Sequence, residues 1–303
     1  MVQIIDRTTQ PSLHWPGIRA VFGKYAEAPT VYTNFMDVKT SSKAHEEDVE
    51  VIGFGLAPVQ PELTPVVFDK TGEGVKIKYR HVAYGLAFAV SREENDDNLY
   101  PAVGARRVRA LNYSMRQTRE IVAHTPLDLA FDNVLGVRPD LVPLISASHP
   151  TPVGNVSNLI ATAADVSELA IEQLVLQIAY MVDQRGLKLD AKPAKMIISP
   201  DSSFEVNRIL GSVLQANSLT NNVNVLRARN IIPEVVVTPY LTDKDAFYIT
   251  TDIPEGFTMF NRSADVEIQE DNMFSNGARL VKAYTRFSVG ISDFRHVFGS
   301  PGA

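Results

Sequence analysis

Cysteine is absent from the 303 residues of this chain, and tryptophan occurs once. Without cysteine the chain can form neither a disulfide nor a thiolate metal site, which excludes disulfide-stapled scaffolds and cysteine-based zinc modules. The absence agrees with folding in a reducing cytoplasm. A basic excess is missing as well, because the formal net charge is −6 and the pI is near 5.6. A dedicated nucleic-acid-binding protein would carry the opposite balance.

Long apolar runs are also lacking. The most apolar stretch, Leu169 to Val182, is too short to span a bilayer and is interrupted by Glu172 and Gln177. The first residues, Met1 to Arg7, have neither the basic nor the apolar region of a signal peptide. Apolar residues make up 45% and charged residues 21%, which is typical of a globular protein with a real core. We therefore expect one large or two modest domains and no membrane partner.

Common catalytic motifs are missing too, since no Gly-x-x-x-x-Gly-Lys, Gly-x-Gly-x-x-Gly or Gly-x-Ser-x-Gly occurs. Asp69-Lys70-Thr71-Gly72 has the letters of the phosphorylated-aspartate motif of ion pumps, but those pumps need membrane helices. Asp, Thr and Gly are ordinary turn residues, so a turn is the favoured interpretation. The embedded Lys-Thr-Gly also occurs in penicillin-binding enzymes, but Thr40 stands where their nucleophilic serine would be.

The six histidines are scattered, and none forms a pair with metal-ligand spacing. The charged run His45-Glu46-Glu47-Asp48 could attract a cation, although a solvated charged face is the favoured interpretation. The sequence therefore predicts no catalytic residue, no metal site and no cofactor, and indicates that the protein is not an enzyme.

The first part of the chain has extended patterns. Residues 1–36 contain scattered prolines and one short helical run, Ile18–Ala26, which predicts an arm. Residues 37–80 are rich in β-forming residues separated by glycine and proline, which predicts a long, irregular two-stranded ribbon. Strict alternation over residues 81–90, from Val82 onward, predicts a half-buried strand.

Two helices follow. Apolar residues spaced three and four apart predict a long helix over about residues 104–124, which ends or kinks at Pro126. The stripe comprises Val108, Leu111, Met115, Thr118 and Val122. A second helix is predicted to begin at a capping box formed by Asp165 and Glu168 and to stop at Gly186.

The last part of the chain mixes strands with one more helix. A strand at Lys195–Ser199 is predicted to lead into a helix with Ser199 as its N-cap and Pro200 as its first residue. Later strands are predicted at Glu234–Thr238, Ala246–Thr251, Val266–Gln269 and Arg279–Phe294. Because strands and helices do not alternate as βαβ units, the predicted fold class is α+β.

Charge is concentrated on the ribbon and on the long helix. A lone two-stranded ribbon is marginal in water, so the ribbon must find support on another molecule. We therefore name as candidate inter-subunit contacts Lys43, Glu46, Glu47, Asp48, Lys70, Arg106, Arg107, Arg109, Arg116 and Arg119. For the arginines, pairing with acidic segments of the same or a neighbouring copy is favoured because the chain is acidic overall, and contact with DNA phosphates stays open.

Three segments resemble a known family. They are Tyr84 through Ser91-Arg92-Glu93 to Asn98, the stretch Pro143 to Pro150 with Gly154-Asn155 and Ser157-Asn158, and the tail Arg286 to Arg295. Together with the order of arm, charged ribbon, long helix and mixed insertion, they resemble the major capsid proteins of tailed phages with the Hong Kong 97 fold. The chain is most similar to the Mu-like prophage major head subunit family.

This resemblance implies an architecture and a role. It implies an N-terminal arm at 1–36, an extended loop at 37–80, a peripheral domain at 81–190 and 262–303, and an axial domain at 191–261. The expected function is a structural capsid protein that self-assembles, as hexamers and pentamers, into an icosahedral shell around double-stranded DNA. The expected location is the virion, after synthesis in the cytoplasm of the host bacterium.

The resemblance also implies partners, and alternatives remain. A separate scaffolding protein and a portal are expected, packaged DNA would be contacted without sequence preference, and a decoration protein is left open. An encapsulin-like bacterial compartment shell shares the fold and would hold an enzyme in place of DNA. A soluble hydrolase is the alternative from another class, and the ribbon argues against it.

Overall fold

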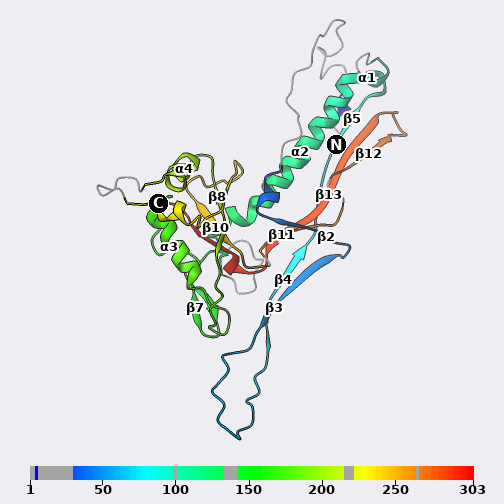
Figure 1. The fold of residues 1–303 in the computed structure, drawn as a ribbon. Helices are drawn as coiled ribbons and strands as arrows, with labels where there is room; N and C mark the ends of the chain where they lie inside the picture. The colour runs from blue at the N-terminus through cyan, green and yellow to red at the C-terminus, as the bar shows by residue number, and fades with distance from the viewer. Residues whose placement is uncertain are drawn as a thin grey trace.

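The computed structural model describes residues 4–5, 30–97, 101–132, 142–214, 222–254, 256–263 and 266–303. Two sheets meet at a junction from which a ribbon projects (Figure 1). The helices are α1 (Arg92–Asp97), α2 (Pro101–Asp128), α3 (Glu168–Ala179), α4 (Ser203–Gly211) and α5 (Val225–Ala228), with 3-10 turns η2 (Tyr32–Asn34) and η4 (Phe294–His296). The predicted helix Ile18–Ala26, and most of the arm, lie outside the described residues.

The strands confirm the predicted α+β class. In chain order they are β1 (Ile4–Ile5), β2 (Asp37–Thr40), β3 (His45–Ile52), β4 (Gly72–Arg80), β5 (Val82–Val90), β6 (His149–Thr151), β7 (Gly154–Val156), β8 (Pro193–Ile198), β9 (Glu234–Val237), β10 (Phe247–Thr251), β11 (Phe257–Asn261), β12 (Glu267–Asn272), β13 (Arg279–Ile291) and β14 (Val297–Ser300). The predicted strands at 81–90, 195–199, 234–238, 246–251 and 266–269 are found within a few residues of their expected bounds. β11 and β14 and the β6–β7 hairpin are not anticipated by the sequence.

The main sheet has six strands in the order β1-β5-β13-β11-β2, with β12 paired to β13. Its longest member, β13, pairs antiparallel with the whole of β5 through Arg279 to Phe287. The predicted final strand is shorter than expected, because the chain leaves the sheet after Ile291 and turns into η4. The long strands of this sheet run alongside α2, as Figure 1 shows.

Helix α2 covers one face of the main sheet. Leu111 and Met115 of its predicted apolar stripe are buried against Val281 and Ala283 of β13. Burying side chains of this size contributes about 2 kcal/mol each. The helix extends beyond the predicted range at both ends. Pro126 lies in its last turn, shortly before the helix ends at Asp128. Proline there lacks the N–H that would bond the Val122 carbonyl, which weakens the last turn.

The small sheet has four strands in the order β14-β10-β8-β9, and β9 is parallel to β8. Met196 and Ile198 of β8 face one side, where they pack against α3, α4 and α5. Ile197 faces the other side and joins a second cluster with Leu127 of α2 and Phe257 of β11. Because this second cluster contains residues from both sheets, the two sheets share one continuous core at their junction.

The ribbon consists of β3 and β4, paired antiparallel with a register shift between Val49 and Val51. One part of the predicted ribbon is placed elsewhere: Asp37–Thr40 forms β2, which pairs in parallel with β11 at the edge of the main sheet. A short strand can pair either within the ribbon or with the main sheet, and its sequence pattern is the same in both cases. Residues 53–71, which connect β3 to β4, form no strand, and we call them the outer loop.

Two predicted helix starts are wrong. The N-cap of α3 is Ser167, whose side chain accepts a hydrogen bond from the Ala170 amide, whereas Asp165 accepts one from the amide of Ala303. The helix ends at Ala179, and Gly186 lies in a later turn with φ of 82°. Likewise Ser199 caps no helix, since its hydroxyl donates to the Lys244 carbonyl and α4 begins only at Ser203.

Asn158 is a fully buried hub that joins three segments. Its side-chain amide nitrogen donates to the carbonyls of Leu144, Phe294 and Val297, at 2.9, 3.1 and 2.9 Å. Its amide oxygen accepts from the Ser146 backbone at 2.8 Å. The Pro143–Asn158 segment and the C-terminal tail, which carry the family resemblance, are therefore held together by one side chain.

Replacing Asn158 by Ala should destabilise the protein by about 3 kcal/mol, because several buried backbone groups would lose their partner. Chemical denaturation of the purified chain measures this. Asn155→Ala, in the exposed β6–β7 hairpin, is the matched control and should change the stability by less than about 0.5 kcal/mol. Equal effects of the two variants would contradict the hub.

Candidate subunit interface

The root of the ribbon is tied to the body of the same chain by a buried arginine. Arg295, whose side chain is 3% exposed, pairs with Glu50 of β3 at 3.2 Å and with Asp293 at 3.1 Å. Its Nε donates to the Val182 carbonyl at 3.0 Å, and Gln184 donates to Glu50 at 2.8 Å. The sequence gives no sign of this role, because the pattern around Arg295 does not show that its side chain is buried.

A second tie involves Asp48, a predicted contact residue. Ser292 donates to the Asp48 carboxylate at 2.6 Å, so the Tyr79 hydroxyl, 2.6 Å from the same oxygen of Ser292, must be the donor in their contact. Tyr79 is buried, and a Cβ added to Gly290 would lie 2.6 Å from its ring. Asp48 therefore holds the ribbon against the body of its own chain. The absence of a side chain at Gly290 leaves the space that the Tyr79 ring occupies.

The outer loop is fastened where it leaves the ribbon. Arg185 donates to the carbonyls of Gly53 and Lys70 at 3.2 and 2.8 Å and lies 3.7 Å from the Asp69 carboxylate. Asp69 accepts from the amides of Gly55 and Lys70, and these bonds lower its pKa. The carboxylate of the pump-like tetrapeptide thus has a structural use, but the predicted turn is not found: residues 69–71 lead without a turn into β4 at Gly72.

Beyond this fastening, the outer loop carries apolar side chains that its own chain leaves uncovered. Leu63 and Phe68 are fully or almost fully exposed, and Leu56 and Val59 are 85% and 94% exposed. The loop curves around a hollow of about 690 Å³ lined by Phe54 to Asp69. Apolar surface of this extent on an extended loop marks a contact with another molecule.

The predicted charged contacts on the ribbon have partners within the chain. Lys43 pairs with Glu46 at 2.9 Å, and the Ser41 hydroxyl donates to the same carboxylate at 2.6 Å. These bonds lower the pKa of Glu46, the bond from Ser41 contributing most. Glu47 pairs with Lys78 of the facing strand at 3.0 Å. Lys70 is exposed, and its hydrogen bonds within the described ranges are made by its backbone.

The predicted arginines of α2 do not share one face. Arg119 is buried, donates to the side chains of Tyr32 and Asn261, and lies over the ring of Phe287 at 5.2 Å. Arg107 pairs with Glu94 of α1 at 3.1 Å. That pair bears out, for one residue, the favoured interpretation that these arginines meet acidic segments.

Three arginines of the predicted set are left. Arg116 is half-buried and already has a contact within the chain. Arg106 is half-buried and Arg109 is exposed, and neither pairs with an acid among the described residues. These two side chains are therefore the part of the arginine set that a neighbouring molecule can reach.

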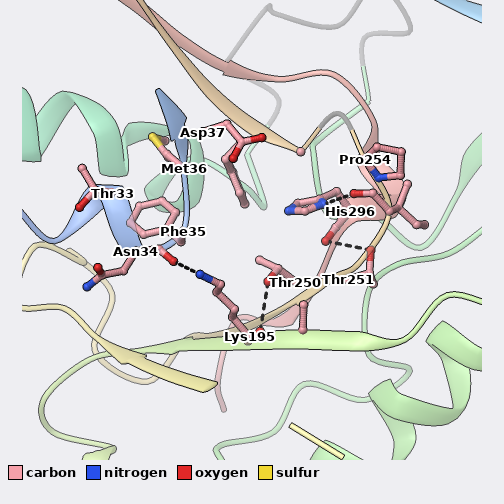
Figure 2. Close-up of a pocket in the computed structure, with 14 residues that line it drawn as sticks. Thr33, Asn34, Phe35, Met36, Asp37, Lys195, Thr250, Thr251, Pro254 and His296 are labelled. Carbon is pink, nitrogen blue, oxygen red and sulfur yellow. Dashed lines mark hydrogen bonds between the residues drawn. The ribbon is translucent and has the colours of Figure 1, made fainter. Parts of the chain in front are cut away.

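A small pocket of about 180 Å³ lies between β2, β8 and β10, next to η4 (Figure 2). Its polar groups mostly bind one another: Lys195 donates to the Asn34 carbonyl and pairs with Glu234, and Thr250 donates to the Lys195 carbonyl. His296 donates through Nδ1 to the Ile253 carbonyl, and burial lowers the pKa of the imidazole. The pocket is a junction between the two sheets, with few polar groups left over for a ligand.

The described residues contain no group of three or more side chains able to hold a metal ion. They also contain no helix that is both long and apolar enough to cross a membrane. His124 is fully buried, contacts the Glu120 carbonyl and the Thr238 hydroxyl at 2.7 and 2.8 Å, and has its pKa lowered by burial. Its place in the shared core is structural.

Comparison with known proteins agrees with this geometry. Residues 74–299 match a family model described as phage capsid protein. The fold is similar to the capsid of a native GTA particle, with 12% identity, TM-score 0.57, and 94% of this chain and 93% of that chain covered. No curated protein sequence matches the chain.

Two phage structures are equally similar in fold. For Mycobacterium phage Patience the identity is 12% and the TM-score 0.57, with 89% of this chain and 82% of that chain covered. For Microbacterium phage Oxtober96 the identity is 8% and the TM-score 0.57, with 98% and 99% covered. These likenesses confirm the predicted Hong Kong 97-type fold, and with the family model covering most of the sequence, the chain belongs to the phage capsid protein family and has the structural role of a major capsid protein.

Proposed function

We propose that copies of this chain assemble, as hexamers and pentamers, into the icosahedral shell of a tailed-phage virion that encloses double-stranded DNA. The observation that carries the proposal is the outer loop, whose apolar side chains between Phe54 and Phe68 are exposed on the isolated chain. One of the similar structures named above is the capsid of a native GTA particle, which supports the same conclusion.

The energetics favour neighbouring copies as the cover. An obligate interface of about 2,000 Å² with about 65% apolar area buries roughly 1,300 Å² of apolar surface. At about 25 cal/mol/Å² this contributes about 30 kcal/mol before ordering costs. A loop fastened at its foot by Arg185 has already lost part of its freedom, which lowers those costs.

Finer assignments follow the sequence resemblance. We propose membership of the Mu-like head subunit group, a purely structural role without catalysis, and synthesis in the host bacterial cytoplasm. A separate scaffolding protein and a portal are proposed partners, and a decoration protein is a further candidate. An encapsulin-like shell is the second candidate function, and the cargo, DNA or enzyme, tells the two apart.

We also propose the division into an arm at 1–36, a loop at 37–80, a peripheral domain at 81–190 with 262–303, and an axial domain at 191–261. Packing supports moving three elements across these bounds. Helix α3 and strand β14 pack with the small sheet, and β11 pairs in the main sheet. The axial domain would then hold the small sheet with its helices, and the peripheral domain the main sheet with α2.

The purified chain, supplied with its scaffolding protein, is expected to form closed shells visible by electron microscopy and fast in sedimentation. Apolar association of the outer loop is the driving force. Purified shells that contain DNA would distinguish a virion from an encapsulin-like compartment. A chain that stays monomeric under every assembly condition would rule out the proposed function.

Replacing residues 54–68 by a Gly/Ser segment of equal length should block assembly and leave the monomer folded. The replaced side chains lie outside every buried cluster of the described residues, so the free energy of unfolding should change by less than about 1 kcal/mol. Sedimentation measures assembly, and a thermal melt measures folding. A monomer that no longer folds would show that the loop belongs to the core.

Changing Arg106 and Arg109 together to Gln should weaken empty and DNA-filled shells alike, because we place these arginines at contacts between copies. The readout is the salt concentration at which shells dissociate, which should fall for both kinds of particle. Lys192→Gln with Lys244→Gln removes the same charge elsewhere and serves as the control. Loss confined to DNA-filled particles would instead favour contact with phosphates.

A further inference from the structure

The helices of the small sheet form a layer on one of its faces. Helix α3 lies over the edge strand β14, whereas α4 and α5 lie toward the opposite edge, where α5 leads into β9. Figure 1 shows α3 and α4 at opposite ends of this layer. Each end has an outward edge that the small sheet cannot cover.

The outward edge of α3 is apolar and acidic. Leu169, Leu176 and Tyr180 are 65%, 57% and 68% exposed, and their spacing of seven and four residues places them on one side of the helix. The buried side of the same helix carries other residues, among them Ile171 and Leu174. The charges between residues 161 and 180 are Asp165, Glu168 and Glu172, and Lys188 lies over the Tyr180 ring at 4.8 Å, so the acidic part of the edge is at Glu168 and Glu172.

The outward edge of α4 and α5 is apolar and basic. Phe204 is 75% exposed and Val225 is 48% exposed. The charged residues of α4, α5 and the turn after them are Glu205, Arg208, Arg227 and Arg229, which leaves a positive excess. The two edges of the layer are therefore alike in apolar character and opposite in charge.

We propose that the α3 edge of one copy packs against the α4–α5 edge of the next copy. This inference rests on the proposed function and names one surface through which it works. Two different patches on one chain make a heterologous contact, which closes into a ring when the rotation between copies allows it. Opposite charge around the apolar residues fixes the partner and the register of the contact.

Charge excludes the simpler symmetric pairings. Packing α3 on a second α3 would bring Glu168 and Glu172 against their own copies, and packing α4–α5 on itself would oppose Arg227 and Arg229 to the same arginines. Like charges facing each other at an interface are unfavourable. When the α3 edge of one copy packs against the α4–α5 edge of another, the apolar residues of both edges are buried and the opposite charges face each other.

The absence of cysteine allows a direct test on assembled particles. Leu176→Cys with Phe204→Cys should give a ladder of covalent multimers when a short, flexible thiol-reactive cross-linker is added. The cross-linked fraction should exceed that of the control Leu176→Cys with Phe274→Cys by about tenfold or more, because adjacent thiols have a high effective concentration. Phe274 is fully exposed on the β12–β13 hairpin, so the control matches in chemistry.

A second measurement covers the case in which the cysteine variants do not assemble. Glu172→Arg alone and Arg229→Glu alone should each lower the yield of particles, and the two changes together should restore it. Intact particles without the ladder, or a failed rescue by the paired charge reversal, would overturn the inference. Failure of the unmodified chain to form particles would instead overturn the proposed function, so the two failures are distinguishable.

Discussion

The buried contact of Arg295 with Glu50 fixes the direction of the ribbon, and the surfaces offered to other molecules depend on that direction. Arg295 belongs to η4, which connects β13 of the main sheet to β14 of the small sheet. One side chain thus ties the ribbon to the junction of both sheets. Arg295 would keep its pair with Asp293 if Glu50 were removed, whereas removing Arg295 would take away the buried cation that both carboxylates share, so Arg295 is the residue that resists rotation of the ribbon.

Local pattern predicted the elements whose burial is decided by near neighbours. The spacing of Leu111 and Met115 predicted α2, and alternation predicted β5. Elements chosen by distant partners were misplaced or missed. β2 lies in the main sheet because it pairs with β11, which is more than 200 residues away in sequence and was itself not predicted. Ser199 resembles a helix cap in sequence, but its hydroxyl donates a hydrogen bond to the Lys244 carbonyl.

Composition located the charged candidates but could not assign their partners. Arg109 and Arg119 are chemically identical, yet one is exposed and the other buried. The sequence did contain a sign of this difference, since Arg119 follows Met115 by four residues and so continues the buried stripe of α2. Arg295 gave no comparable sign, because its acceptors come from separate segments of the chain.

Pairing of charges within the chain has a consequence for assembly. Lys43, Glu46 and Glu47 neutralise one another or near neighbours along the ribbon, and between Phe54 and Phe68 the outer loop carries one charge, Glu62. Contacts made by the loop therefore gain from apolar burial and are little affected by salt. Charges without an ion pair among the described residues include Glu172 of α3, Arg229 after α5, and Arg106 and Arg109 of α2, and these can select the partner copy without having to hold the shell together.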